Sequence, residues 1–142
     1  MTVFLDASVI ISALASPKGG SGMILKLSTL GSFSLVTSGL VFQETAKNIS
    51  KIKTDKESLI SLLEKRIITL VPNPNEDLIN RFRKITPDTD DAHVLAGAVT
   101  SGANFLISLD KKHILTSLVK NSLKPINVLS PKEFWQWIDK DI

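Results

Sequence analysis

The sequence contains no cysteine, and this absence limits the chemistry open to the protein. Without thiols there can be no disulfide, no thiolate nucleophile and no cysteine-ligated zinc or iron–sulfur site. No apolar run is long enough for a membrane-spanning helix, and the first ten residues include Asp6 but no basic residue. We therefore expect no membrane segment and no signal peptide, and these absences favour a cytoplasmic protein.

Basic residues are also missing from one stretch of the chain, although the net charge is +3. Residues 87–110 contain four aspartates and no lysine or arginine, whereas residues 47–86 contain nine basic and five acidic residues. Residues 111–142 are basic again, with six basic and three acidic residues. Basic segments attract polyanions, whereas an acidic block repels phosphate unless a cation neutralises it. Helix capping and turns are the simpler explanation for any single acid in the block.

The apolar pattern predicts an α/β protein. Short, nearly continuous apolar runs, typical of strands buried on both faces of a parallel sheet, cover residues 2–5, 33–36, 67–71, 105–108 and 126–129. Helical patterns cover residues 20–30 and 111–119. Further helices are predicted to begin near Ser38, Thr54, Asn75 and Ser130. One more begins at Asp90 or Asp91 and ends at Gly102. This alternation predicts a three-layer α/β/α sandwich with a mostly parallel sheet of about five strands, in a single domain covering residues 1–142.

Four acidic residues from separate segments are predicted to meet at the carboxyl edge of this sheet. Asp6 directly follows the first strand, and Asp110 follows the fourth. Asp91 begins a helix at the same edge, and Glu44 lies within about two turns of the edge on the helix after the second strand. Ligands of parallel sheets bind at this edge, so these residues are the candidate site.

Such a cluster needs a positive partner, because two like charges about 4 Å apart repel by roughly 4 kcal/mol at an effective dielectric of about 20. No lysine or arginine lies between Pro87 and Asp110 or in the strand that ends at Asp6, so a divalent cation is the simplest partner. Oxygen ligands favour Mg²⁺ or Mn²⁺ over Zn²⁺, since cysteine is absent and His93 and His113 lie in different segments. Such an ion would lower the pKa of a bound water and stabilise charge on a scissile phosphate, which suits phosphodiester hydrolysis.

Nearly the whole chain resembles the PIN-domain ribonucleases, and in particular the toxins of VapBC-like toxin–antitoxin pairs. The resemblance is carried by VFLDASVIISALASPKGGSG (3–22), FSLVTSGLVFQETAKNI (33–49), PDTDDAHVLAGAVTSGANFLISLDKKHIL (87–115) and INVLSPKEFW (126–135). It implies a PIN-like fold and a metal-dependent endoribonuclease that hydrolyses RNA. The family's acidic tetrad, which is both catalytic and metal-binding, falls on Asp6, Glu44, Asp91 and Asp110.

The resemblance also implies roles for residues around the tetrad. Ser8 and Ser108 fall where the family has small hydroxyl residues, while Ala7 stands where it often has Thr or Ser. Asp88 and Asp90 compete with Asp91 for one acidic position of the family. A small antitoxin that occludes the site and a homodimer are further implications of the resemblance.

Five lysines are candidates for contacts to RNA phosphates: Lys47, Lys51, Lys53, Lys111 and Lys112. A solvated helix face explains any one of them equally well. His93 fits a packed helix residue, and His113 a surface turn.

One alternative function fits the sequence equally, and two others fit it less well. A catalytically weak or inactive PIN-fold module that binds nucleic acid would have the same sequence features. A phosphotransfer receiver needs an acidic pair after its first strand and an aspartate after a middle strand, and neither is present. A haloacid-dehalogenase-like phosphatase needs a second aspartate at position 8, where this chain has Ser8.

Overall fold

The structure is a computed structural model that describes residues 1–52 and 54–140. At its centre lies a five-stranded sheet of β1 (Thr2–Leu5), β2 (Ser34–Ser38), β3 (Ile68–Val71), β4 (Phe105–Ile107) and β5 (Asn127–Leu129). The strand order is β3-β2-β1-β4-β5, and every neighbouring pair is parallel. The expected parallel sheet of about five strands is therefore confirmed.

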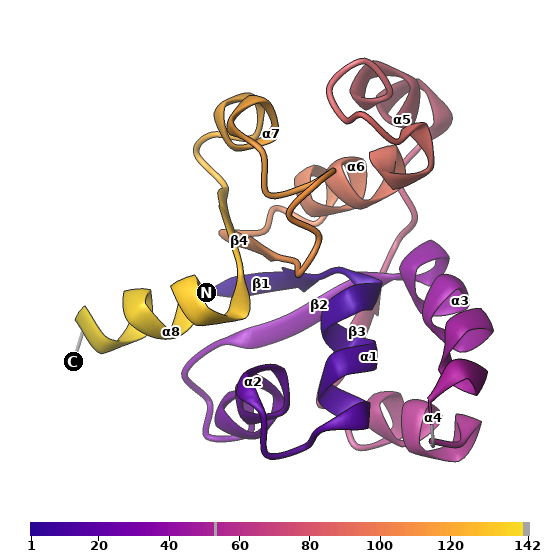
Figure 1. Ribbon diagram of the computed structural model, residues 1–142, viewed down its shortest axis with the longest axis vertical. Helices are drawn as coiled ribbons and strands as arrows, with labels where there is room; N and C mark the ends of the chain where they lie inside the picture. The colour runs from indigo at the N-terminus through magenta and orange to yellow at the C-terminus, as the bar shows by residue number, and fades with distance from the viewer. Residues whose placement is uncertain (53, 141–142) are drawn as a thin grey trace.

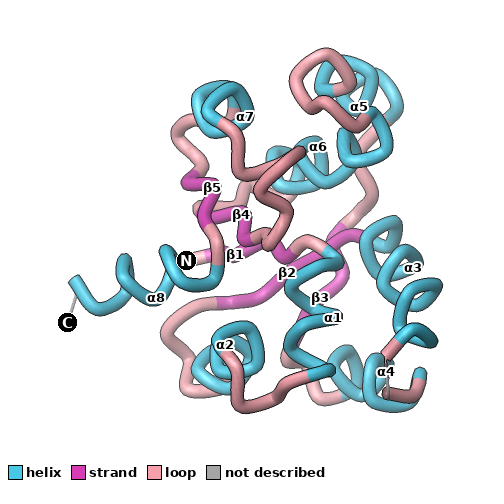
Figure 2. The backbone as a smooth tube through the Cα atoms, in the orientation of Figure 1, coloured by secondary structure: helices cyan, strands magenta, loops and turns pink. Residues whose placement is uncertain are grey.

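Helices cover both faces of the sheet (Figures 1 and 2). One layer contains α1 (Ala7–Ala15), α2 (Gly20–Ser28), α3 (Gly39–Asn48), α4 (Lys56–Glu64) and α8 (Pro131–Lys140). The other contains α5 (Glu76–Phe82), α6 (Ala92–Thr100) and α7 (Ser117–Ser122). Two 3₁₀ turns are also present: η1 (Ile49–Lys51) follows α3, and η2 (Thr89–Asp91) precedes α6. The fold is thus the predicted three-layer α/β/α sandwich. That residues 1–142 form a single domain stays a prediction.

Local signals explain most of the helix boundaries. Asn75 accepts a hydrogen bond from the Leu78 N–H at the start of α5, and Ser130 and Glu133 form a reciprocal capping box at the start of α8. Gly102 follows α6 with a φ of 67°, the left-handed conformation expected of a glycine after a helix. These caps were readable from the sequence because each involves residues at most three apart.

Three local predictions were wrong. Helix α1 was not expected, because its apolar residues continue the run of β1 without a break; the Asp6 side chain caps it by accepting from the Ala7 N–H. Helix α4 begins at Lys56 with Asp55 as its cap, slightly later than the start expected near Thr54, whose hydroxyl donates to the Leu14 carbonyl. The segment after Asp110 first makes turns, so that α7 begins only at Ser117.

The outer strands also differ from the prediction of strands buried on both faces. Val3, Phe4 and Leu5 of the central strand β1 are fully buried, as expected. In the edge strand β3, Thr69 and Leu70 are exposed because no helix covers that part of the strand completely. No helix in the described part of the chain has the length and apolar character needed to cross a membrane.

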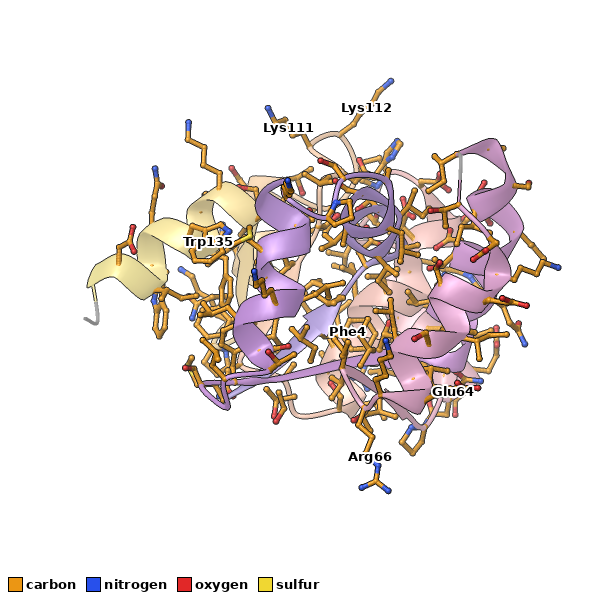
Figure 3. The ribbon with its side chains drawn as sticks, turned by 90° about the horizontal axis from the view of Figure 1, so that it is seen from below. Phe4, Glu64, Arg66, Lys111, Lys112 and Trp135 are labelled. Carbon is orange, nitrogen blue, oxygen red and sulfur yellow. The ribbon has the colours of Figure 1, made fainter. Side chains whose placement is uncertain are left out.

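Close packing of α6 on β1 sets the position of the acidic segment. A Cβ atom at Gly97 would lie 2.7 Å from Cζ of Phe4, which occupies the interior of the fold (Figure 3). Only glycine therefore lets α6 approach β1 this closely without displacing a fully buried ring. The contact fixes the position of α6, whose cap residue is Asp91, relative to β1, which is followed by Asp6.

Candidate functional site

The candidate site lies where the direction of strand addition reverses. From β1 the chain builds outward through β2 to β3, and it then returns to place β4 and β5 on the other side of β1. In open parallel sheets this reversal leaves a crevice beyond the carboxyl ends of the two central strands. Asp6 follows β1 and Asp110 follows β4, and the Asp6 N–H donates to the Ile107 carbonyl at 3.1 Å. Both aspartates therefore lie at one edge, as the sequence predicted.

Asp6 is a buried carboxylate held by three hydrogen bonds. The exposed fraction of Asp6 is only 5%. The Ala7 N–H donates to Oδ1 at 2.8 Å, and Oδ2 accepts from the hydroxyls of Ser108 at 2.7 Å and Ser8 at 3.1 Å. Burial raises the pKa of Asp6, these hydrogen bonds partly oppose that effect, and the charge of Asp110 adds to it.

The two serines connect Asp6 to the end of β4. The Ser8 hydroxyl accepts from the Leu109 N–H at 3.1 Å, and the Ser108 hydroxyl accepts from the Asp110 N–H at 3.0 Å. Each hydroxyl therefore donates to Asp6 and accepts from the loop that carries Asp110. The expected small hydroxyl residues lie directly beside the acids and set the orientation of Asp6.

Replacing Ser108 by alanine is expected to lower the free energy of unfolding by about 1–2 kcal/mol. The buried carboxylate of Asp6 would lose its shortest hydrogen bond, and the Asp110 N–H would lose its acceptor. The free energy is measured by urea denaturation. Ser101→Ala is the matched control: its hydroxyl donates to the Ala98 carbonyl at the end of α6, so we expect a loss of about 0.5 kcal/mol or less. Equal losses in the two variants would contradict the role given to Ser108.

The remaining predicted acids interact electrostatically with Asp6 and with one another. Burial, and then the charges of Asp6, Asp110, Asp88 and Glu44, raise the pKa of Asp91 to about 7. Burial raises the pKa of Glu44, and so do the charges of Asp6, Asp90 and Asp88. Asp6, Glu44, Asp91 and Asp110 are thus electrostatically coupled, and they are called the acidic cluster below.

The three acids before α6 have different surroundings. Asp90 is exposed, whereas Asp88 and Asp91 are partly buried. Asp88 caps the turn η2 by accepting from the Asp90 N–H at 2.9 Å. Asp91 occupies the cap position of α6 but makes no side-chain capping bond, so its carboxylate is free for other partners. Among the three, Asp91 is the best placed to act within the acidic cluster.

One contact was missed from the sequence: His113 lies against the acidic cluster. Its Nδ1 is 3.1 Å from Oδ2 of Asp110 and 3.6 Å from Oδ2 of Asp91. One ligand atom each from Asp88, Asp91 and His113 lie within 4.8 Å of one another. His113 does lie on a turn, as expected, but the turn folds back on the site. His113 had no part in the site predicted from the sequence.

The only sequence signal for His113 is its spacing from Asp110. An aspartate at the end of a strand can accept hydrogen bonds from the next turn, and Oδ1 of Asp110 accepts from the N–H groups of Lys112 and His113. That turn brings the residue three positions later back beside the aspartate. His93, by contrast, is a half-buried residue of α6 whose pKa is lowered by burial, in keeping with the packed helix residue that was expected.

The acidic cluster fits a divalent cation. Across residues 1–52 and 54–140, no lysine or arginine forms an ion pair with these acids, and the only side-chain nitrogen at ion-pair distance from them is Nδ1 of His113. Burial, and after it the negative charge of the neighbouring acids, raises the pKa of Asp91. Carboxylate oxygens are the ligands that Mg²⁺ and Mn²⁺ prefer. The donor set is therefore suitable for such an ion.

The candidate lysines lie at different distances along the chain from the acidic cluster. Lys111 and Lys112 directly follow Asp110, are exposed and point outward from the molecule, on the side opposite Arg66 (Figure 3). Lys47 is exposed on α3, one turn after Glu44, and Lys51 is exposed on η1. Lys53 lies outside the described residues.

Comparison with known proteins identifies the family. The PIN domain profile matches residues 2–112. VapBC2 from Rickettsia felis, bound to a DNA fragment from its promoter, has a similar structure with a TM-score of 0.66, at 14% identity over 92% of this chain and 98% of that chain. VapBC-1 from nontypeable Haemophilus influenzae has a TM-score of 0.59, at 19% identity over 93% of this chain and 99% of that chain.

A third similar structure is VapC20 from Mycobacterium tuberculosis, described as a Sarcin-Ricin loop cleaving toxin. Its TM-score is 0.57, at 14% identity over 77% of this chain and 90% of that chain. No curated protein matches the chain by sequence. The similar structures share the fold, and the profile match covers more than half of the residues, which confirms the resemblance seen in the sequence. The chain therefore belongs to the PIN domain family.

Proposed function

We propose that the protein is a divalent-metal-dependent endoribonuclease and the toxin of a toxin–antitoxin pair. The observation that supports the proposal is the acidic cluster, in which acids from four chain segments interact electrostatically and form no ion pair with a lysine or arginine among the described residues. Membership of the PIN domain family supports nuclease chemistry at this cluster.

Each residue of the cluster has a proposed role. Asp6, Glu44, Asp91 and Asp110 hold Mg²⁺ or Mn²⁺, which when bound lowers the pKa of a water and stabilises charge on the scissile phosphate. Ser8 and Ser108 orient Asp6 through the hydrogen bonds that they donate. Glu44 is half-buried, and its raised pKa suits a base that orients the attacking water.

Incubation of the purified chain with end-labelled single-stranded RNA tests this proposal. Cleavage is expected with Mg²⁺ or Mn²⁺ and should stop when a chelator is added. Cleavage that persists in the chelator would contradict the metal dependence. RNA binding without cleavage, under all metal conditions, would favour the alternative of a PIN-fold binding module.

Lys111 and Lys112 are proposed to contact the RNA backbone beside the site. Replacing either by alanine should reduce the salt dependence of RNA affinity, with the slope of log K against log salt falling by about 0.7 for a single-stranded ligand. Filter binding at several salt concentrations measures the slope. Arg66→Asn is the control, since Arg66 lies on the opposite side and asparagine tolerates its φ of 57°. A slope that changes only in the control would contradict this contact.

The partners and location of the protein are also proposals. Two of the similar structures are VapBC proteins, which supports a small antitoxin that covers the acidic cluster here. Co-purification with the product of a neighbouring reading frame tests this partner. A homodimer and a cytoplasmic location stay predictions, and a monomer by light scattering would count against the dimer.

A further inference from the structure

The loop after β4 carries His113 back to the acidic cluster and holds it there. Oδ1 of Asp110 accepts from the His113 N–H at 2.9 Å, and the buried Thr86 hydroxyl donates to the His113 carbonyl at 3.0 Å. The next residue, Ile114, is fully buried and anchors the loop in the core. The backbone of His113 is thus fixed from both sides, so its imidazole does not reach the acids through a flexible surface loop.

The imidazole presents one nitrogen to two carboxylates from different segments. Its Nδ1 lies 3.1 Å from Oδ2 of Asp110 and 3.6 Å from Oδ2 of Asp91, and its side chain is 29% exposed. Ligand atoms of His113, Asp91 and Asp88 lie within 4.8 Å of one another. Two ligands on opposite sides of an ion with bonds of about 2.1 Å are about 4.2 Å apart, so small side-chain adjustments would suffice to enclose an ion.

A nitrogen ligand changes which ion such a site prefers. Mg²⁺ is a hard cation that selects oxygen ligands, whereas imidazole suits transition-metal ions. We propose that Nδ1 of His113, once it has released its proton to solvent and given up its contact with Asp110, is a ligand of the bound metal ion, together with Asp91 and Asp88, and that it gives the site a preference for Mn²⁺ over Mg²⁺. This inference rests on the proposed metal-dependent function and deepens it.

Metal affinities provide the first test. Isothermal titration of the full chain with Mn²⁺ and with Mg²⁺ gives a dissociation constant for each ion. In His113→Gln the constant for Mn²⁺ should rise about tenfold or more, while that for Mg²⁺ should change about twofold or less, so that the preference is lost. The matched variant His93→Gln should keep the wild-type preference.

A spectroscopic measurement tests the bond itself. Because the chain has two histidines, the nitrogen coupling of a metal-bound imidazole can be assigned with two variants. Electron spin echo modulation of the Mn²⁺ complex should show this coupling in the wild type and in His93→Gln, and should lack it in His113→Gln. A purely structural role of His113 would produce no such signal.

Several results would overturn the inference. These are a Mn²⁺ complex of the wild type without nitrogen coupling, a coupling that survives in His113→Gln, or a coupling lost only in His93→Gln. Tighter binding of both ions by His113→Gln with an unchanged preference would also overturn it, and would make His113 a counter-cation of the acids. Metal-dependent RNA cleavage without nitrogen coupling refutes only the His113 ligand, whereas a wild type that binds neither ion refutes the proposed metal dependence as well.

Discussion

Replacing Asp6 by asparagine is expected to reduce metal-dependent RNA cleavage by about 1,000-fold or more while the protein stays folded. The amide removes one anionic ligand from the acidic cluster, and metal stabilisation of the transition state is worth several kcal/mol, with each 1.36 kcal/mol changing the rate tenfold. Asparagine has nearly the shape of aspartate and can still accept the Ala7 N–H. The hydroxyls of Ser8 and Ser108 can turn to accept from its amide.

The same substitution should not lower stability in the absence of metal. Asp6 is buried, its pKa is raised, and it is repelled by Asp110, so the neutral amide relieves an unfavourable charge. Initial rates with labelled RNA and urea midpoints in a chelator measure the two effects. Asp77→Asn, which neutralises an exposed acid on α5, is the control and should change neither quantity. An unchanged rate in Asp6→Asn would refute the proposed site.

Without a divalent ion, the protein is expected to become less stable as the pH rises from about 4 to above 7. The pKa of Asp91 is about 7 in the folded protein against an ordinary value of 3.8, so the folded state binds this proton more tightly than the unfolded state. The resulting stability is fully present below about pH 4 and is lost as the pH rises through 7. Glu44 and Asp6 act in the same direction, because burial raises the pKa of each.

We expect the free energy of unfolding to fall by about 1–2 kcal/mol between pH 5 and pH 8. The fall is limited because water partly screens the charge of Asp91. Urea denaturation in a chelator at both pH values measures it. Asp91→Asn should remove most of the loss, and added Mn²⁺ should reverse it in the wild type. Asp55→Asn is the control: hydrogen bonds from Ser58 lower the pKa of Asp55, so its stabilising effect is lost only at acidic pH. A pH dependence unchanged in Asp91→Asn would contradict the assignment.

Most of the fold was predictable because its signals are local. Apolar runs marked all five strands, and the caps at Asn75 and Ser130 marked helix starts through contacts between residues three apart. Helix α1 was missed because its apolar residues follow those of β1 without a polar break, and only the Asp6 cap separates the two elements. The exposed residues of β3 depend on the strand's place at the sheet edge, which strand order decides.

The site was predictable to different degrees for different residues. Asp6 and Asp110 follow directly from the rule that parallel strands end at a common edge. Glu44 needed the family resemblance, since an acid two turns into a helix is ordinarily a solvated residue. The structure separates Asp90, which is exposed, from Asp91, which is partly buried and lies 3.6 Å from Nδ1 of His113.

The sequence by itself determined the strand ends, the acids that follow them and the lack of basic residues from Pro87 to Asp110, because each of these is a property of a short segment. Only the tertiary structure decided that His113 joins the acids. That contact depends on the turn capped by Asp110 and on the hydroxyl of Thr86, which lies 27 residues away along the chain. Contacts of this range depend on how loops from separate crossovers pack together, and periodicity and spacing within one segment carry no information about them.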